Sequence, residues 1–248
     1  MTGTDTASAA PALSVVAPMY NEAGGAVALA EEIAAALAGV AHEIVFVDDA
    51  STDDTLAVLR DAQARLPQLR VLAHEFNAGQ SRAIRTGVLA ARAPAVATLD
   101  GDGQNDPKDI VELYAALMRG GDRLAMVAGE RRGRQDSAAK KIASRAANAI
   151  RKRLLRDGAA DTGCGLKAFR RDAFLALPYF DHMHRYLPAL MSREGYEVAF
   201  LPVAHRPRAH GRSKYTNIGR ALVAFRDLAG VMWLAARARK PGEIREQT

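Results

Sequence analysis

The first 130 residues alternate between short apolar runs and helix-like stretches, and this alternation limits the fold more than any other feature of the chain. Apolar runs long enough for a buried strand occupy the ranges 13–17, 43–47, 69–73, 95–99 and 124–128. Between them, apolar residues recur three and four positions apart over about 25–38, 53–65, 79–92 and 108–119. Strand, helix and strand at this spacing predict crossover connections, and therefore a mostly parallel sheet with helices on both faces.

The pattern after residue 130 is less regular. It predicts a basic helix over about 137–156, a glycine-rich turn at 161–165, short helices near 171–177 and 184–193, a strand at 198–203 and a last helix over about 217–238. The chain therefore divides into a tail at 1–12, an α/β domain at 13–215, an amphipathic helix within 216–240 and a tail at 241–248.

Polar residues gather where three of the predicted strands end. The loops after the first, second and fourth strands read PMYNE, DDAS and DGDGQ. Ligands bind beyond the carboxyl ends of the strands in such sheets, so these loops are the predicted site. Asp100 and Asp102 repel each other unless a cation separates them, and Mg2+-like ions prefer oxygen ligands, which Gln104 can also supply. The sequence thus indicates a divalent-cation site; a pair of turn-forming aspartates is the alternative.

Two other metal-dependent classes fit the spacing less well. An EF-hand loop counted from Asp100 needs glycine at its sixth position, where this chain has Asn105, and the flanking segment is a predicted strand. Phosphatases with an aspartyl nucleophile usually carry their aspartate pair after the first strand of the domain, whereas here the pair follows the fourth.

The charge is divided unevenly along the chain. Residues 1–118 hold 7 Lys and Arg against 16 Asp and Glu, a net −9, whereas residues 119–248 hold 27 against 12, a net +15. Most of these charges are expected on solvated surface. A split of this size nevertheless favours a front half that handles a cation and a back half that handles an anion, such as nucleic acid, phospholipid or a phosphorylated substrate.

Compartment and membrane contact are predicted from cysteine and apolar content. The single cysteine, Cys164, excludes an internal disulfide framework and fits a reducing compartment. The first dozen residues do not resemble a signal peptide, and no run reaches the ~20 apolar residues of a spanning helix. Arg226 and Asp227 interrupt the last apolar stretch, and each central charge costs ~2.5–3.5 kcal/mol on insertion. We therefore expect this helix to lie in a membrane interface or to pack on the domain.

Four motifs in order and spacing, APMYNE, VDDASTDDT, NAGQSRAIRTG and LDGDGQNDP, resemble the family 2 glycosyltransferases, which have a GT-A fold. Within that family the chain resembles polyprenyl-phosphate hexose synthases of the dolichol-phosphate mannose synthase type, because the back half adds TGCGLKAFRRDAF and the basic loop from Arg208 to Lys214. The resemblance covers roughly residues 13–235 and implies a GT-A (Rossmann-like) sheet followed by C-terminal helices that bind the acceptor.

The resemblance also implies a role for each matching position. Nucleotide-sugar contacts are expected from Pro18, Tyr20, Glu22, Asp48 and Asp49. Ligands to Mg2+ or Mn2+ beneath the donor diphosphate are expected from Asp100, Asp102 and Gln104. Contacts to donor and acceptor phosphates are expected from Arg131, Arg145, Arg208, Ser213 and Lys214. Asp102 and Arg131 are the expected catalytic residues.

The chain departs from the family pattern at two places, neither of which is an expected metal ligand. Gly101 replaces a more usual alanine, and the run from Cys164 to Lys167 replaces a more usual Ser-Gly-Phe-Arg. We expect the second to alter acceptor or sugar preference.

The implied reaction is inverting transfer of a hexosyl group from a nucleotide sugar to polyprenyl or dolichyl phosphate. GDP-mannose is the default donor and a UDP-sugar the alternative. A lipid phosphate is already ionised, so it needs positioning more than proton removal. The implied location is cytoplasmic, at the inner face of the membrane. Because related chains often carry spanning helices that this sequence lacks, a separate membrane protein is a further expected partner.

Three rival functions remain open. A family 2 transferase with a sugar or protein acceptor would keep the metal site without needing Arg208 and Lys214. A nucleotidyltransferase would need a basic, glycine-rich loop after the first strand, which PMYNEAGG does not provide. A nucleic-acid-binding module is suggested by the pI of about 9.7, but the acidic front half and the aromatic content of 6% oppose it, so no nucleic-acid partner is expected.

The remaining conspicuous residues have ordinary expected roles. His182 and His184 are expected in a loop or at a helix start, with metal binding disfavoured. Cys164 is expected to be a small packing residue rather than a nucleophile. The basic residues within 137–156, Arg151 among them, are expected mostly on a solvated helix face.

Overall fold

The computed structural model describes residues 10–131, 151–155, 157–207 and 217–239. Its sheet has seven strands in the order β3-β2-β1-β4-β6-β5-β7 within these residues. The strands are β1 (Leu13–Met19), β2 (His42–Asp48), β3 (Leu69–Ala73), β4 (Ala95–Thr98), β5 (Leu124–Arg131), β6 (Lys167–Arg170) and β7 (Glu197–Val203). Five of these strands match the apolar runs of the first 130 residues, and β7 matches the strand predicted near residue 200.

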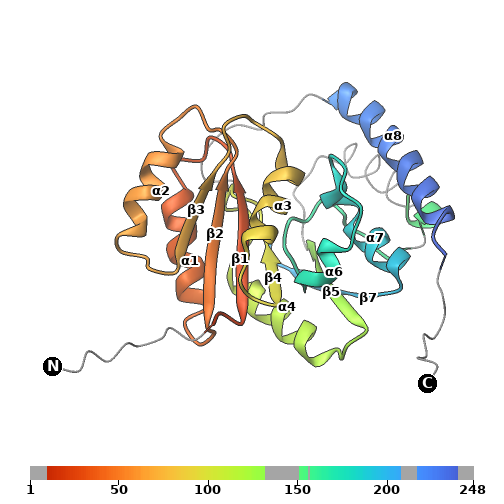
Figure 1. Cartoon of the computed structure of the whole chain (residues 1–248), viewed down its shortest axis with the longest axis horizontal. Coiled ribbons are helices and arrows are strands. Elements are labelled where there is room, and N and C mark those ends of the chain that lie inside the picture. The colour runs from red at the N-terminus through yellow and green to blue at the C-terminus, as the bar shows by residue number, and fades with distance from the viewer. Residues whose placement is uncertain (1–9, 132–150, 156, 208–216, 240–248) are drawn as a thin grey trace, which may run out of the picture.

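The predicted helices are also present where the structure describes the chain (Figure 1). They are α1 (Ala26–Ala36), α2 (Thr55–Gln63), α3 (Gln80–Ala90), α4 (Lys108–Arg119), α6 (Arg171–Leu175), a 3-10 turn η1 (Met183–Arg185), α7 (Leu187–Glu194) and α8 (Asn217–Ala236). Of the basic helix expected over 137–156, only residues 151–155 are described, and they are helical.

The sheet is covered by helices on both faces, which explains why the centres of its strands are rich in apolar residues on both sides. Side chains alternate along β1: Val15 joins the core made with α1, α2 and α4, whereas Val16 joins the core made with α3, α6 and α7. The same alternation separates Phe46 from Val47 on β2. Each helix stripe that the sequence predicts thus has a matching face of the sheet to cover.

One strand is absent from the sequence-based prediction. β6 (Lys167–Arg170) runs antiparallel between β4 and β5, in the middle of a sheet whose other pairs are parallel. The sequence indicates a glycine-rich turn that leads directly into a helix here. A strand of four residues with charged ends has too few positions to show a period of two, so only its partners reveal it.

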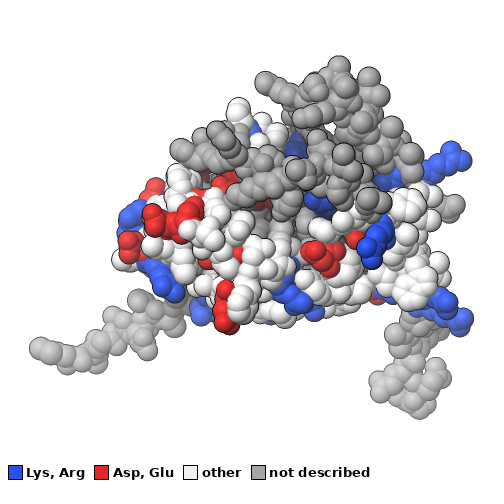
Figure 2. Space-filling view, turned by 90° about the horizontal axis from the view of Figure 1, so that it is seen from above, with Lys and Arg blue, Asp and Glu red and all other residues white. Residues whose placement is uncertain are grey.

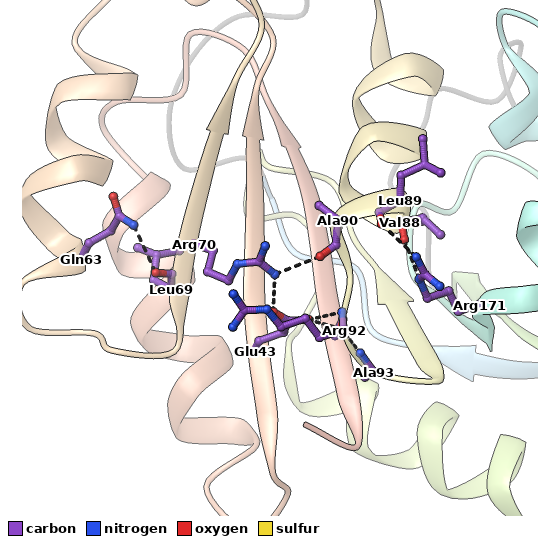
Figure 3. A network of polar contacts seen from close by, with 11 residues as sticks. Glu43, Gln63, Leu69, Arg70, Val88, Leu89, Ala90, Arg92, Ala93 and Arg171 are labelled. Carbon is purple, nitrogen blue, oxygen red and sulfur yellow. Dashed lines mark hydrogen bonds and ion pairs between the residues drawn. The ribbon is translucent and has the colours of Figure 1, made fainter. Parts of the chain in front are cut away.

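The amino ends of the strands are held by a buried polar network around Glu43 (Figure 3). Glu43 accepts hydrogen bonds from the Ser14 hydroxyl at 2.6 Å, from the Arg92 backbone N–H at 2.6 Å and from Arg70 Nη1 at 2.5 Å. Arg70 Nη1 also donates to the Ala90 carbonyl oxygen at 3.0 Å. This network joins β1, β2 and β3 to the end of α3, at the sheet edge opposite the loops of the predicted site.

Arg151 corrects one expectation about the basic helix. Its exposed fraction is 8%, and its Nη1 lies 2.5 Å from Asp157 while Nη2 donates to the Ala159 carbonyl oxygen at 2.6 Å. The side chain therefore anchors the segment after the helix rather than facing solvent, because it finds a carboxylate and a carbonyl within eight residues of itself.

Candidate active site

The candidate site lies at the carboxyl end of β1, the strand on either side of which the sheet is extended in opposite directions. β1 pairs with β2 on one side and with β4 on the other, so the loops that follow these three strands meet at one edge. Gly101 permits the contact: a Cβ at this position would lie 2.6 Å from both the Pro18 carbonyl oxygen and the Met19 sulfur. Figure 2 looks onto this edge and shows Asp and Glu gathered mainly on the side of α1 and α2.

The loop after β1 is tied to the loop after β2. The backbone N–H of Asn21 donates to the Ser51 hydroxyl at 2.9 Å, and that of Glu22 donates to the Thr55 hydroxyl at 2.8 Å. These bonds hold in place the expected nucleotide-contact residues of the first loop, which are half-buried: Pro18, Tyr20 and Glu22.

The two neighbouring aspartates after β2 have different surroundings. Asp49 accepts bonds from the backbone N–H groups of Ala78 at 2.9 Å and Gly79 at 2.8 Å, and its Oδ1 lies 2.6 Å from His74 Nδ1. Asp48 is 2% exposed, and its Oδ1 has no hydrogen-bond partner in the described part of the chain. Asp49 therefore organises the loop before α3, whereas Asp48 offers an acceptor that a bound group can use.

The expected metal ligands follow β4 within one tight loop. The Asp100 backbone N–H donates to Asn105 Oδ1 at 3.0 Å, and the Gln104 backbone N–H donates to Asp102 Oδ1 at 3.1 Å. Burial, and then the charge of Asp102, raise the pKa of Asp100 above its usual value. A divalent cation would relieve this repulsion, and the oxygen donors fit a hard ion.

The protein alone does not complete a coordination shell in this loop. Among the described residues, no group of three or more His, Cys, Asp and Glu side chains could hold a metal ion. Asp100 and Asp102 supply two carboxylates and Gln104 an amide oxygen, so an ion held here would need further oxygens from a ligand. Sites that share Mg2+ with substrate phosphates have this composition.

The segment that carries the second departure from the family pattern packs against Asp100, an expected metal ligand, through Gly165, a residue that the usual pattern shares. A Cβ on Gly165 would lie 2.4 Å from the Asp100 carboxylate, so only a hydrogen fits there. The buried Lys167 ammonium group donates to the Cys164 carbonyl oxygen. Its positive charge offsets part of the rise in the pKa of Asp100. The segment that enters β6 therefore forms one wall around Asp100.

Arg131, at the end of β5, is held side-on by Asp161. Its Nε lies 2.6 Å and its Nη2 2.8 Å from the two carboxylate oxygens. Burial lowers the pKa of Arg131, but the contacts with Asp161 outweigh this effect and the net pKa is raised. Arg131 packs against the same glycine-rich segment as Asp100, since a Cβ on Gly163 would lie 2.7 Å from Arg131 Nη2, and its charge offsets part of the rise in the pKa of Asp100.

The described residues just before the basic loop lie beside the loop of expected metal ligands. The Arg206 backbone N–H donates to the Gln104 carbonyl oxygen at 2.8 Å, and Gln104 Nε2 donates back to the Arg206 carbonyl at 3.4 Å. The Arg206 guanidinium lies 2.6 Å from Glu32 and 2.8 Å from Asp106. Four expected phosphate-contact residues lie outside the described residues: Arg145, Arg208, Ser213 and Lys214.

The two histidines and the cysteine take the structural roles expected of them. His184 Nδ1 lies 2.7 Å from the Ser81 hydroxyl, and His182, just before η1, lies 3.1 Å from Asp227 of α8. Cys164 is 1% exposed in the core.

Two further residues of the site were not singled out from the sequence. Gln80 Nε2 donates to Asp100 Oδ1 at 2.8 Å, and Asp161 holds Arg131. Gln80 stands inside the NAGQSRAIRTG motif and Asp161 starts the glycine-rich turn, so both lie in segments that the sequence marks as unusual. Their partners are 20 and 30 residues away and have no local signal.

Comparison with known proteins agrees with the fold. The model of the family described as Glycosyl transferase family 2 matches residues 14–177. A dodecaprenyl-phosphate galacturonate synthase of Rhizobium johnstonii is 35% identical over 94% of this chain and 70% of its own length. An undecaprenyl-phosphate 4-deoxy-4-formamido-L-arabinose transferase of Edwardsiella ictaluri is 36% identical over 82% of this chain and 62% of its own length. The chain thus spans about two thirds of these relatives.

Solved structures of lower identity share the fold. Glucosyl-3-phosphoglycerate synthase of Mycobacterium tuberculosis, solved with Mn2+, UDP and product, superposes with a TM-score of 0.67 at 16% identity, over 94% of this chain and 82% of that one. A Pyrobaculum calidifontis mannosyltransferase, solved with GDP-Man and Mn2+, gives 0.63 at 19% identity, over 92% and 74%. The expected resemblance is confirmed: this chain belongs to glycosyl transferase family 2 and has the GT-A fold.

Proposed function

We propose that this protein transfers a sugar from a nucleoside-diphosphate donor to a polyprenyl phosphate. The observation that carries the proposal is that Asp100 and Arg131 pack against the same glycine-rich segment. A Cβ on Gly165 would lie 2.4 Å from the Asp100 carboxylate, and one on Gly163 would lie 2.7 Å from Arg131 Nη2. The names of the relatives support the acceptor, since both act on a polyprenyl phosphate by name.

In this proposal the loop from Asp100 to Gln104 stabilises the diphosphate leaving group. Asp100, Asp102 and Gln104 would hold Mg2+ or Mn2+, which would supply positive charge to the diphosphate as its own charge grows. Hydrogen bonds within the protein hold the conformation of this loop. The Asn105 side chain accepts from the Asp100 backbone N–H, and the Arg206 backbone bonds to both the carbonyl oxygen and the side-chain amide of Gln104. The unpartnered Oδ1 of Asp48 would accept a hydrogen bond from the nucleoside.

The cations of the back half would position the lipid phosphate. Asp161 takes Nε and Nη2 of Arg131 and thereby sets the plane of the guanidinium group. Arginine in a fixed plane suits phosphate oxygens, which it binds in pairs. Arg145, Arg208, Ser213 and Lys214 would add to this anion site. Because the acceptor is already ionised, direct attack would invert the anomeric carbon without a general base.

The donor sugar is the part of the proposal in which the relatives differ most from the expectation based on the sequence. GDP-mannose was the default from the sequence, whereas the two relatives carry galacturonate and a formamido-arabinose in their names. A uronic acid linked to UDP, which falls within the UDP-sugar alternative expected from the sequence, is therefore the first donor to test, and GDP-mannose is the second.

We further propose that α8 brings the enzyme to the inner face of a membrane. Within the described residues, no helix is both long and apolar enough to cross a bilayer. One side of α8 packs on the domain through Val231, which is 2% exposed, while Phe225 and Trp233 are 72% and 60% exposed. Arg237 lies over the Trp233 ring, 5.7 Å from its centroid. An exposed aromatic pair with adjoining basic residues suits an anionic interface.

A donor screen followed by a transfer assay tests the main proposal. Thermal unfolding is measured with UDP- and GDP-sugars, with and without Mn2+, and the stabilising donor is then incubated with a short polyprenyl phosphate. We expect metal-dependent stabilisation by one donor class and formation of a lipid-linked sugar, both lost in Asp102→Asn. Transfer only to a free sugar or a peptide would overturn the lipid acceptor, and transfer without any divalent cation would overturn the metal site.

A further inference from the structure

Gln80 connects the first turn of α3 to an expected metal ligand. Its Nε2 donates to Asp100 Oδ1 at 2.8 Å, and this is a contact between side chains from two different loops of the site. The bond directs Oδ1 of Asp100 toward α3 and so restricts where the second oxygen can point. Gln80 is the first residue of α3, so its position depends on how that helix begins.

The beginning of α3 is fixed from two sides. On one side, the backbone N–H of Gly79 donates to Asp49 at 2.8 Å. On the other, the Ser81 oxygen accepts from the His184 backbone N–H at 3.3 Å and its hydroxyl lies 2.7 Å from His184 Nδ1. Burial lowers the pKa of His184 well below its usual value, which favours an uncharged ring in this contact. Ser81 is 1% exposed, which excludes water from this contact.

The other sides of Asp100 are equally constrained. Its backbone N–H is bound by Asn105, and Gly165 packs so closely that a Cβ there would lie 2.4 Å from the carboxylate. Among the described residues, the Asp100 carboxylate therefore packs against Gly165 on one side and accepts the Gln80 amide bond on another. Among the described residues, Gln80 supplies the side-chain hydrogen bond that Asp100 accepts.

We propose that Gln80 is a positioning residue that orients Asp100 for the cation, and that the Ser81–His184 contact holds Gln80 in place for this task. The inference rests on the proposed function, because it assumes that Asp100 is a metal ligand. A partner that orients a metal ligand typically changes metal affinity by 10–100-fold when it is removed.

The test is a Mn2+ titration of the full chain, with free Mn2+ followed by electron paramagnetic resonance in the presence of UDP or GDP. Gln80→Met keeps the length of the side chain and removes its donor. We expect its apparent Kd for Mn2+ to rise about 10-fold or more. Ser81→Ala, which keeps the Gln80 donor but removes the contact with His184, is expected to raise the Kd by a smaller factor. An unchanged Kd in folded Gln80→Met would overturn the inference.

Two control variants separate this inference from the rest. Gln63 Nε2 donates to the Leu69 carbonyl at 3.3 Å, away from the site (Figure 3), so Gln63→Met removes a similar bond and should leave the Kd unchanged. Asp100→Asn should abolish tight Mn2+ binding. If it does so while Gln80→Met binds normally, only the role of Gln80 is wrong; if Asp100→Asn also binds normally, the metal site itself is wrong.

Discussion

Arg131 and Asp161 form a bidentate ion pair, with Nε and Nη2 of the guanidinium at 2.6 and 2.8 Å from the two carboxylate oxygens. The side chains are 15% and 12% exposed, so water does little to screen them. The pair also closes the glycine-rich turn, because the Gly163 backbone N–H donates to Asp161 at 3.1 Å. The ion pair therefore fixes the direction of the Arg131 guanidinium group beside the loop of expected metal ligands.

Asp161→Asn should reduce catalysis because the Arg131 guanidinium group would lose its fixed orientation. An amide can accept from only one side of the guanidinium fork, so Arg131 would turn away from its present plane. Misplacement of a positioning group can cost about 100-fold, and we expect kcat/KM for transfer to polyprenyl phosphate to fall by 10- to 100-fold. Steady-state kinetics with varied acceptor measure this effect.

The control for Asp161→Asn is an ion pair on the surface. Glu197 lies 3.2 Å from Arg123, with side chains 56% and 80% exposed. Such pairs contribute little, so Glu197→Gln should leave kcat/KM unchanged. An Asp161→Asn enzyme as active as Glu197→Gln would show that Arg131 needs no partner.

Gly165→Ala should disturb Asp100 by direct contact. The new methyl group would lie 2.4 Å from the carboxylate, closer than any real side-chain contact, so Asp100 or β6 must move. We expect metal-dependent activity to fall at least 10-fold, with a lower melting temperature because a tightly packed contact is overfilled. Activity as a function of Mn2+ concentration and a thermal melt measure the two effects.

Gly39→Ala provides the matched control for this substitution. A Cβ on Gly39 would meet no atom within 4 Å. The same change of residue should therefore leave activity unaffected, so normal activity in Gly165→Ala would contradict the close packing on Asp100.

Glu43 should make stability depend on pH in the acid range. Burial raises the pKa of Glu43, but the bonds from Ser14, Arg92 and Arg70 outweigh it, so the folded-state pKa lies below the unfolded value. The contribution is therefore present above the unfolded pKa of about 4.3 and is lost as the pH falls through the folded pKa. Glu43→Gln should lower the free energy of unfolding by about 2 kcal/mol near neutral pH, and by less in acid.

Urea unfolding near pH 7 and below pH 4 distinguishes Glu43 from exposed acids. Glu31 pairs with Arg65 at 3.4 Å, but both side chains are more than half exposed. Glu31→Gln should thus change stability little at either pH. An equal loss in Glu43→Gln at both pH values would contradict the linkage.

Removing the exposed aromatic side chains of α8 should weaken membrane binding. Phe225→Ser together with Trp233→Ser deletes apolar area that the fold does not bury, so flotation with anionic vesicles should fall while the melting temperature stays unchanged. Leu89→Ser, at an apolar side chain 53% exposed on α3, is the control and should float as the parent protein does. Equal flotation of all variants would overturn the role of α8.

The sequence predicts the architecture well because the relevant signals are local. Burial on both faces makes the strands of the first 130 residues rich in apolar residues, and the helices between them show apolar residues every three or four positions. The loop motifs at 18–22, 48–51 and 100–104 also follow from the strand ends, since parallel strands bring their carboxyl ends to one edge. Family membership rests on the same segments.

The partners within the site were decided by tertiary structure. Ser81 and His184 are 103 residues apart, and Arg131 and Asp161 are 30 apart, so no spacing rule relates them. The different roles of Asp48 and Asp49 likewise depend on the tertiary structure, because the Asp49 carboxylate binds the loop before α3 and Asp48 Oδ1 has no partner among the described residues. The reversed direction of β6 brings Gly165 against Asp100. The chain thus encodes its elements through short-range periodicity, whereas hydrogen-bond partners are selected only when packing brings distant segments within 3 Å of one another.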